Sequence, residues 1–368
     1  MIYTVINFLF FYSIFIGLYI FKKIRLNLLF IFFFLLLSVF FFNGFLFHPG
    51  YMPDQESFVL LVSKVRGLNF YFLDDYFLNV SDRTFLSAGF MALVPAPFIY
   101  DYLDVSLQQK FLYLCTILYL YNKKALNHYS LAILLFLPSI VLYTGVALKE
   151  SFLFLLVSFG FYFSLKRKYI FSLIAYTILA LVKPLIFILG FGFNLFYLLI
   201  FEYKMLMYVR ILFLIIIFSI LLFFIIQNIE LINSEFIERR IVESIYDQRI
   251  DQPTELNLLN FLSILNLIMV SFMNFLFNPN IFSAINLFQF IQSIENIFFL
   301  ILLIFNFFYC YRINKAKSFF WILYFLAGMI IIGGTVFNAG TLSRWKTEII
   351  MYYIFYINLS CLKLKNQE

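Results

Sequence analysis

The stretch Leu28–Phe42, with the sequence LLFIFFFLLLSVFFF, contains no charged residue and decides the class of the protein. Similar apolar blocks recur along the chain and are long enough for helices that cross a membrane core about 30 Å thick. Of the 368 residues, 64% are hydrophobic and 12% are charged, whereas soluble domains have about 25% charged residues. The block also lacks the alternation of a membrane β-barrel strand. The sequence therefore predicts an all-α, polytopic membrane protein with one integral membrane domain over residues 1–368.

Clusters of Lys and Arg in short loops predict which side of the membrane faces the cytoplasm. The clusters lie at residues 22–25, 123–124, 166–168 and 312–317. Placing all of them inside predicts about eleven transmembrane helices, with the N-terminus outside and the C-terminus inside. The expected spans are residues 2–21, 26–47, 106–121, 129–147, 151–165, 169–183, 185–201, 207–227, 294–311, 319–337 and 348–362. The Pro-containing segments 85–104 and 259–293 are expected to be re-entrant or interfacial on the outer face.

This topology gives the outer face both of the large loops, at residues 48–105 and 228–293, and nearly all of the acidic residues. We therefore expect any chemistry on the outer face, where no nucleotide pool exists and an activated donor has to arrive on a lipid. The basic clusters indicate membrane orientation. Nucleic-acid binding is not expected, because the outer face has no basic stripe with interleaved aromatic residues. The three Cys residues lie in apolar segments without metal-ligand spacing, so neither a metal site nor a disulfide is expected.

Two carboxylates stand close together just after the second predicted span. In the segment YMPDQES, Asp54 and Glu56 are two residues apart at the expected membrane surface. A partly buried carboxylate there would be suited to take a proton from a hydroxyl nucleophile. The alternative is an ordinary solvated loop.

Two lysines interrupt apolar sequence further along the chain. Lys149 and Glu150 form a turn between two short apolar segments, and Lys183 precedes Pro184 in an otherwise apolar stretch. Ionisable groups at membrane depth are costly and mark functional sites, and a lysine supplies a compact cation for an anionic ligand. The alternative to ligand binding is that each lysine only extends its amino group to the membrane surface, with Glu150 as the partner of Lys149.

Three arginines and Lys346 supply the remaining candidate cations. Arg239 and Arg240 lie in a polar helical stretch whose acids also favour salt pairs within the helix. Arg344 and Lys346 end the segment GGTVFNAGTLSRWK at 333–346, whose glycines permit close backbone approach and whose Arg offers a planar fork for phosphate oxygens. We expect Lys149, Lys183, Arg239, Arg240, Arg344 and Lys346 to bind a diphosphate without a metal ion.

The pattern of these segments resembles the Wzy-type polymerases of bacterial O-antigen and capsular polysaccharides and the related EpsG-like membrane proteins. The similarity extends over about residues 45–362. It rests on Asp54 in the first outer loop, the hairpin Pro138–Ser151, the pair Lys183–Pro184, the segment Phe275–Pro279 with the following Ser293–Glu295, and the closing Asn338–Arg344. Two departures are Lys183, where the family has Arg, and Asn278, where a basic residue is common.

The resemblance implies a polymerase in the inner membrane with its active site facing the periplasm. Its substrate would be an undecaprenyl-diphosphate-linked oligosaccharide in the lipid bilayer, and its candidate protein partners a chain-length regulator and a flippase. The cations would stabilise the leaving diphosphate, and Asp54, Glu56 or Glu150 would assist the acceptor hydroxyl, with inversion at the anomeric carbon and no cofactor. The alternatives are a transporter or flippase of lipid-linked sugars, and an O-antigen ligase.

Overall fold

The computed structural model describes residues 2–43, 54–67, 82–203, 261–282, 284, 287–336 and 339–365. Within these ranges the chain forms helices joined by turns, and no β-strand occurs. Contacts divide the chain into two compact units, Met1–Ile188 with Leu362–Glu368 (unit 1) and Leu189–Cys361 (unit 2). The predicted all-α class is confirmed for the described residues, and the predicted span 207–227 lies outside them.

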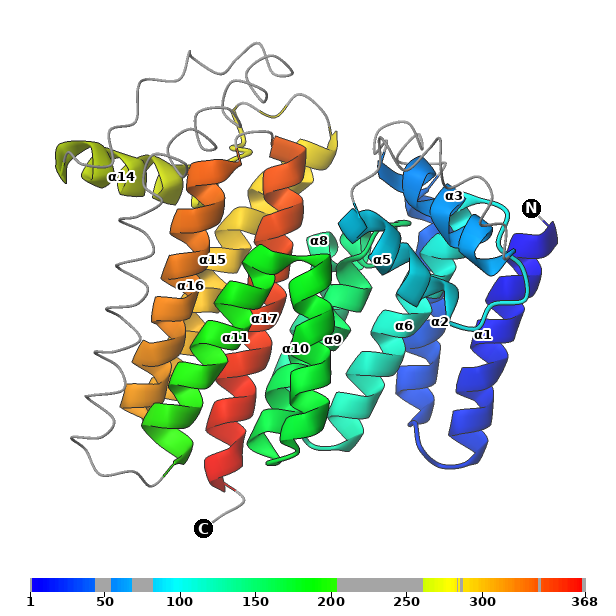
Figure 1. Cartoon of the computed structure of the whole chain (residues 1–368), viewed down its shortest axis with the longest axis horizontal. Coiled ribbons are helices and arrows are strands. Elements are labelled where there is room, and N and C mark those ends of the chain that lie inside the picture. The colour runs from blue at the N-terminus through cyan, green and yellow to red at the C-terminus, as the bar shows by residue number, and fades with distance from the viewer. Residues whose placement is uncertain are drawn as a thin grey trace. The chain divides into compact units, whose positions relative to one another are not determined.

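Unit 1 is built on long apolar helices (Figure 1), and aromatic side chains of these helices pack against one another. Phe11 stacks on Phe111 with ring centroids 4.5 Å apart, and Phe15 meets Phe32 edge to face at 4.9 Å. These contacts join the helices Ile2–Ile20, Leu26–Phe42 and Tyr102–Asn122 into one core. The helices of unit 1 are α1 (Ile2–Ile20), α2 (Leu26–Phe42), α3 (Asp54–Arg66), α5 (Asp82–Ala92), α6 (Tyr102–Asn122), α7 (His128–Phe136), α8 (Pro138–Tyr143), α9 (Glu150–Leu165), α10 (Tyr169–Val182) and the first part of α11 (Pro184–Tyr197).

Unit 2 contains the end of α11 and the helices that follow it. Its α14 lies across α16 (Figure 1), and a Cβ atom on Gly333 would come within 2.1 Å of the backbone oxygen of Ser271. Only glycine permits this approach. The described elements of unit 2 are the π-helix η3 (Leu198–Glu202), α14 (Phe261–Phe277), α15 (Leu287–Ile313), α16 (Lys315–Thr335) and most of α17 (Ala339–Lys365), whose last residues from Leu362 belong to unit 1.

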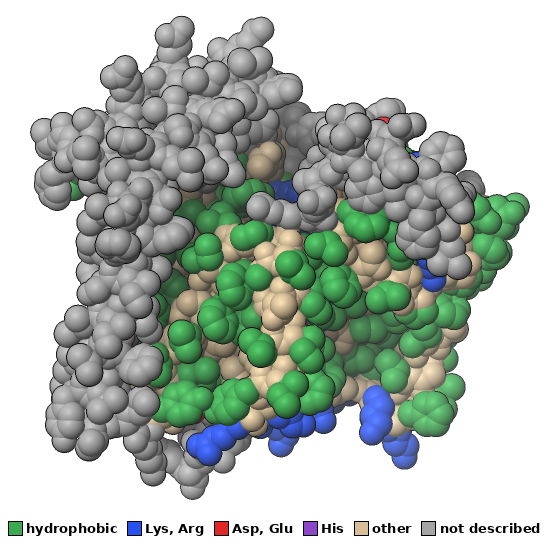
Figure 2. Space-filling model, viewed as in Figure 1, with side chains coloured by type: hydrophobic (Ala, Val, Ile, Leu, Met, Phe, Trp, Pro, Cys, Tyr) green, Lys and Arg blue, Asp and Glu red, His purple; other side chains and the backbone are tan. Residues whose placement is uncertain are grey.

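Among the described residues, four helices are long and apolar enough by length and composition to cross a membrane, namely Ile2–Ile20, Pro184–Glu202, Gln289–Ile313 and Lys315–Gly333. Shorter apolar helices are Leu26–Phe42, Glu150–Leu165, Tyr169–Val182 and Ile268–Phe277. On the face shown in Figure 2, hydrophobic side chains cover most of the described part, and most of the Lys and Arg side chains in view lie along its lower edge. The membrane character of the chain is thus supported, and the predicted number of eleven spans is not confirmed.

The predicted continuous span 129–147 is wrong. The chain leaves helical geometry at Leu137, where ψ is 122°, and a separate short helix begins at Pro138. Proline has no N–H to donate and its ring clashes with the carbonyl one turn earlier, so α7 ends before it. The break shortens both helices and leaves an irregular loop at residues 144–149, between α8 and α9.

The segment 85–104 is α5 followed by irregular chain, and α5 is too short to cross a membrane. The carbonyl groups near Pro95 and Pro97 receive hydrogen bonds from two side chains. Arg66 donates to the oxygens of Ala92, Val94 and Ala96 at 2.5–3.4 Å. Gln108 donates to Met91 and Val94 at 2.9 and 2.6 Å. Irregular backbone is therefore paired within the protein, as membrane proteins require.

Three of the basic clusters lie at one end of unit 1. Asn122, at the end of α6, donates a hydrogen bond to the backbone oxygen of Lys23 at 2.9 Å. The helices α6 and α9 run parallel, because Tyr113 contacts Phe154 and the later Tyr119 contacts the later Phe159. The turn at 166–168 after α9 is therefore at the same end as Lys123 and Lys124. We call the opposite end, where α6 and α9 begin, the outer end of unit 1.

Candidate functional site

The outer end of unit 1 contains a buried cluster of polar side chains around the loop 144–149. Asn43, at the end of α2, donates to the hydroxyl of Ser106 at 2.8 Å and to the backbone oxygen of Gly145 at 3.4 Å. Asn43 and Ser106 are both buried. Buried polar groups are retained where hydrogen bonds compensate their desolvation, and here those bonds join α2, α6 and the loop.

Lys110 of α6 is the buried cation of this cluster, with 1% of its surface exposed. Its Nζ donates to the backbone oxygen of Val141 at 2.6 Å and to Oγ1 of Thr144 at 2.8 Å. A Cβ atom on Gly145 would lie 3.2 Å from Cε of Lys110 and 3.1 Å from the oxygen of Val141, so the loop passes the lysine closely. A cation at the carboxyl end of a short helix complements the helix dipole. Lys110 thereby fixes the end of α8 and the start of the loop.

Glu150 is the first residue of α9 and is fully buried. A carboxylate in the first turn of a helix is favoured by the helix dipole, which lowers the cost of its burial. The preceding Lys149 is half-buried and occupies the N-cap position. The hydroxyl of Ser151 donates to the backbone oxygen of Thr144 at 3.4 Å, closing the loop on itself. The structure thus places the predicted pair Lys149 and Glu150 at a buried helix start.

The first predicted constellation lies against this loop. Oε1 of Gln55, in the first turn of α3, accepts a hydrogen bond from the backbone N–H of Ala147 at 2.9 Å, and Gln55 is buried. Glu56, the next residue, is exposed. Asp54 begins α3, and its side chain lies outside the described part of the structure. Of the two predicted bases with described side chains, Glu150 is enclosed by protein and Glu56 faces outward.

Lys183 lies at the same end of the α9–α10 hairpin as Glu150. The hairpin turns at residues 166–168, and Ser172 donates to the backbone oxygen of Gly160 at 2.7 Å. Gly160 also lies against the ring of Tyr176. These contacts fix a register in which Lys183 and Glu150 are almost equally far from the turn. Lys183 is buried, with 8% of its surface exposed, and separates α10 from α11.

In unit 2, Lys346 of α17 supports the turn after α14. Its Nζ donates to the backbone oxygen of Asn278 at 3.1 Å and to Oδ1 of Asn296 at 2.8 Å. Asn296 in turn donates to the oxygen of Pro279 at 3.0 Å. Buried Glu295 interacts electrostatically with Lys346. Two of the three N–H groups of Lys346 are thus used by the protein.

The other predicted cations are placed differently. Arg344, two residues before the end of the segment 333–346, is half-buried in α17. Arg239 and Arg240 lie outside the described residues. The structure therefore brings Lys149, Lys183 and Glu150 to the outer end of unit 1, and it places Arg344 and Lys346 together in unit 2.

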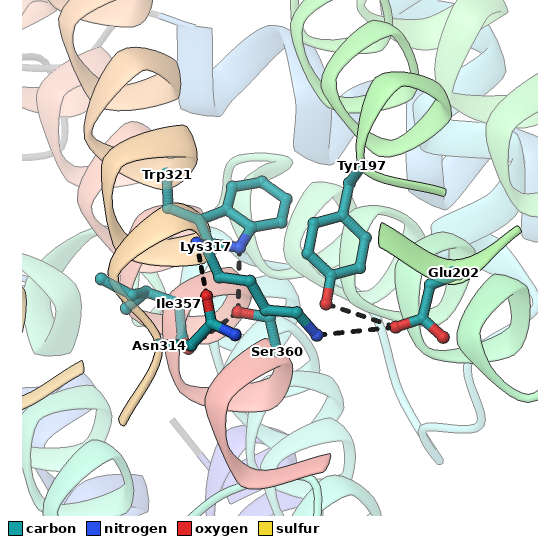
Figure 3. A network of polar contacts seen from close by, with 7 residues as sticks. All are labelled: Tyr197, Glu202, Asn314, Lys317, Trp321, Ile357 and Ser360. Carbon is teal, nitrogen blue, oxygen red and sulfur yellow. Dashed lines mark hydrogen bonds and ion pairs between the residues drawn. The ribbon is translucent and has the colours of Figure 1, made fainter. Parts of the chain in front are cut away.

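A second polar network in unit 2 was not predicted from the sequence (Figure 3). Nζ of Lys317 lies 3.8 Å from Oε1 of Glu202 and 5.2 Å from the ring centre of Tyr197, whose hydroxyl also reaches Glu202 at 3.4 Å. One turn further along α16, Trp321 donates to the hydroxyl of Ser360 at 2.9 Å. The network joins η3, α16 and α17, and its chemistry is that of a structural anchor with cation–π support.

No three His, Cys, Asp or Glu side chains within the described ranges are grouped as metal ligands would be. Comparison with known proteins finds no matching family model, no similar curated protein and no similar solved structure. Functional inference for this chain therefore rests on the chemistry of its own residues.

Proposed function

We propose that the protein is a membrane glycosyltransferase that polymerises lipid-linked oligosaccharide units on the periplasmic face of the bacterial inner membrane, in O-antigen or capsule assembly. The observation that carries the proposal is the full burial of Glu150 next to Lys149, at a helix break inside a largely apolar unit. Ionisable side chains at such breaks in membrane proteins are costly and mark functional sites. The resemblance of the sequence pattern to Wzy-type polymerases supports the same function.

In the proposed reaction, the acceptor is the non-reducing sugar hydroxyl of one lipid-linked repeat unit. Its oxygen attacks the anomeric carbon of a growing chain that is held on undecaprenyl diphosphate. A new glycosidic C–O bond forms, the anomeric C–O bond to phosphate breaks, and undecaprenyl diphosphate leaves with the electron pair. The hydroxyl proton passes to Glu150 as general base, and a single displacement inverts the anomeric carbon.

The cations would supply the electrostatic part of catalysis. Lys149 and Lys183 lie at the same end of unit 1 as Glu150, where they would stabilise the negative charge that grows on the leaving diphosphate. Arg344 and Lys346 belong to unit 2, so we assign the diphosphate at the Glu150 end to Lys149 and Lys183. We propose that this end faces the periplasm, which the basic turns at the opposite end support through the positive-inside rule.

A transporter of lipid-linked sugars is the second candidate. The observation in its favour is the pair of broken helices, α7–α8 and α10–α11, because transporters commonly bind substrates at interrupted helices. A transporter would use the same cations to bind the lipid, and it would need no general base.

The test is to incubate the purified protein in lipid nanodiscs with lipid-linked repeat units extracted from source cells in which the gene is deleted. We expect a ladder of longer lipid-linked glycans. A matched control is Lys166→Gln, which removes a cation from the opposite end of unit 1 and should leave the ladder intact. Absence of a ladder together with movement of the same lipids across a liposome membrane would replace the transferase by the transporter.

A further inference from the structure

Gln109 of α6 is a buried amide without a protein partner. Only 1% of its surface is exposed, and neither Nε2 nor Oε1 forms a hydrogen bond with any described residue. Its neighbour Gln108 is also buried and its Oε1 also has no described partner, but its Nε2 donates to two backbone oxygens. Folded proteins seldom leave both ends of a buried amide unpaired, and such a group calls for a functional explanation.

Helix geometry places Gln109 opposite Glu150. Tyr113 of α6 contacts Phe154 of α9, with ring centroids 5.3 Å apart. Gln109 precedes Tyr113 by one helical turn, and Glu150 precedes Phe154 by one turn. Residues one turn apart share a face of a helix, and α6 and α9 run parallel. Gln109 and Glu150 therefore lie on facing sides of the two helices at the same level.

The chemistry of the amide selects the kind of ligand. The side chain of Gln109 offers two N–H donors and one carbonyl acceptor. A diphosphate offers only acceptors and would leave Oε1 unpaired, whereas a sugar hydroxyl both donates and accepts. A hydroxyl between Gln109 and Glu150 would satisfy the amide and would face the proposed base.

We propose that Gln109 binds the acceptor sugar hydroxyl that Glu150 deprotonates, which makes Gln109 a substrate-binding residue of the transferase. The inference rests on the proposed function for the identity of the base, and it adds the acceptor subsite. Both side chains are enclosed in this structure, so a hydroxyl held between them would be kept away from bulk water.

The experiment compares Gln109→Met with Gln108→Met, since both replace a buried amide by an apolar side chain of similar length. Binding to each protein is measured with two probes, undecaprenyl diphosphate without sugar and the lipid-linked repeat units from the deletion strain. Thermal unfolding is measured in the same nanodiscs.

For Gln109→Met we expect a higher unfolding temperature, because an unpaired amide leaves the core. We also expect about tenfold or greater weakening for the sugar-bearing lipid and unchanged affinity for bare undecaprenyl diphosphate. For Gln108→Met we expect a lower unfolding temperature, because the backbone oxygen of Met91 loses its donor and that of Val94 keeps only Arg66, at 3.4 Å.

Three results would overturn the inference. These are unchanged binding of the sugar-bearing lipid by Gln109→Met, equal weakening of both probes, and destabilisation equal to that of Gln108→Met. Failure of the proposed function gives a different result: wild type would bind the sugar-bearing lipid through Gln109 and yet form no ladder. Wild type that binds neither probe would overturn both proposals.

Discussion

Replacing Gly160 by Ala should loosen the hairpin that places Lys183 at the level of Glu150. A Cβ atom at this position would lie 2.7 Å from Cζ and 2.8 Å from Cε2 of Tyr176, where ordinary contacts begin near 3.4 Å. The ring of Tyr176 is buried and cannot move freely. Overpacking of this size costs about 1–3 kcal/mol, and the better helix propensity of Ala returns about 0.5–1 kcal/mol. We expect a net loss of about 0–2.5 kcal/mol in the free energy of unfolding.

The matched control is Gly17→Ala in α1, because a Cβ atom at Gly17 has no atom within 4 Å. This variant should gain about 0.5–1 kcal/mol from helix propensity alone. The assay is reversible unfolding of the purified protein in mixed detergent micelles. A second substitution, Tyr176→Leu, should remove most of the penalty of Gly160→Ala, with a coupling energy of at least about 0.5 kcal/mol in a double-mutant cycle. If Gly160→Ala is as stable as Gly17→Ala, the packing of α9 on α10 described here is wrong.

Two further predictions concern unit 2 and use the same unfolding assay. Gly333→Ala should lower the free energy of unfolding by about 3 kcal/mol or more, because the new Cβ meets the backbone oxygen of Ser271. The control Gly328→Ala should lose less, because its Cβ meets only side-chain atoms. Equal losses would refute the crossing of α14 on α16. Glu202→Gln and Lys317→Met should each lower the free energy of unfolding by about 1–2 kcal/mol. The double variant should lose less than the sum of the two, because the two side chains form one ion pair. Strict additivity would show that the ion pair contributes nothing to stability.

Apolar runs and their basic ends were sufficient to predict several helices. The expected spans 2–21, 151–165 and 169–183 agree closely with α1, α9 and α10, because uninterrupted apolar sequence between Lys and Arg turns leaves few other choices. Three of these turns contain a basic residue with positive φ, at Lys22, Lys124 and Arg167. A residue in the left-handed conformation ends a helix by redirecting the chain. Glycine is the usual residue at such a position, and since these three positions hold Lys or Arg, the sequence did not indicate the left-handed conformation.

The start of α6 was predicted too late because its first turns are polar. The expected span began at 106, whereas α6 begins at Tyr102. Asp104 is buried there because Asn7 donates to its Oδ1 at 2.9 Å. Lys110 is buried because the backbone oxygen of Val141 and the hydroxyl of Thr144, at the end of α8, accept hydrogen bonds from its Nζ. These partners come from distant parts of the chain, so local hydropathy cannot show that such residues lie inside.

The candidate site was predicted in part for the same reason. Lys149, Glu150 and Lys183 stand out as charges within apolar sequence, and the structure places all three at one end of unit 1. Gln109 carries no charge and lies beside other polar residues, so its burial and its missing partner appear only once α6 packs on α9.

The central claim is that Glu150 is the general base of a glycan transfer, and Glu150→Gln tests it most directly. The measurement pairs the dissociation constant for lipid-linked repeat units with the rate of ladder formation by the same purified protein. We predict wild-type affinity and a loss of about 10²–10⁴ in rate, which is the usual contribution of a general base. Ladder formation at the wild-type rate by Glu150→Gln would contradict the account.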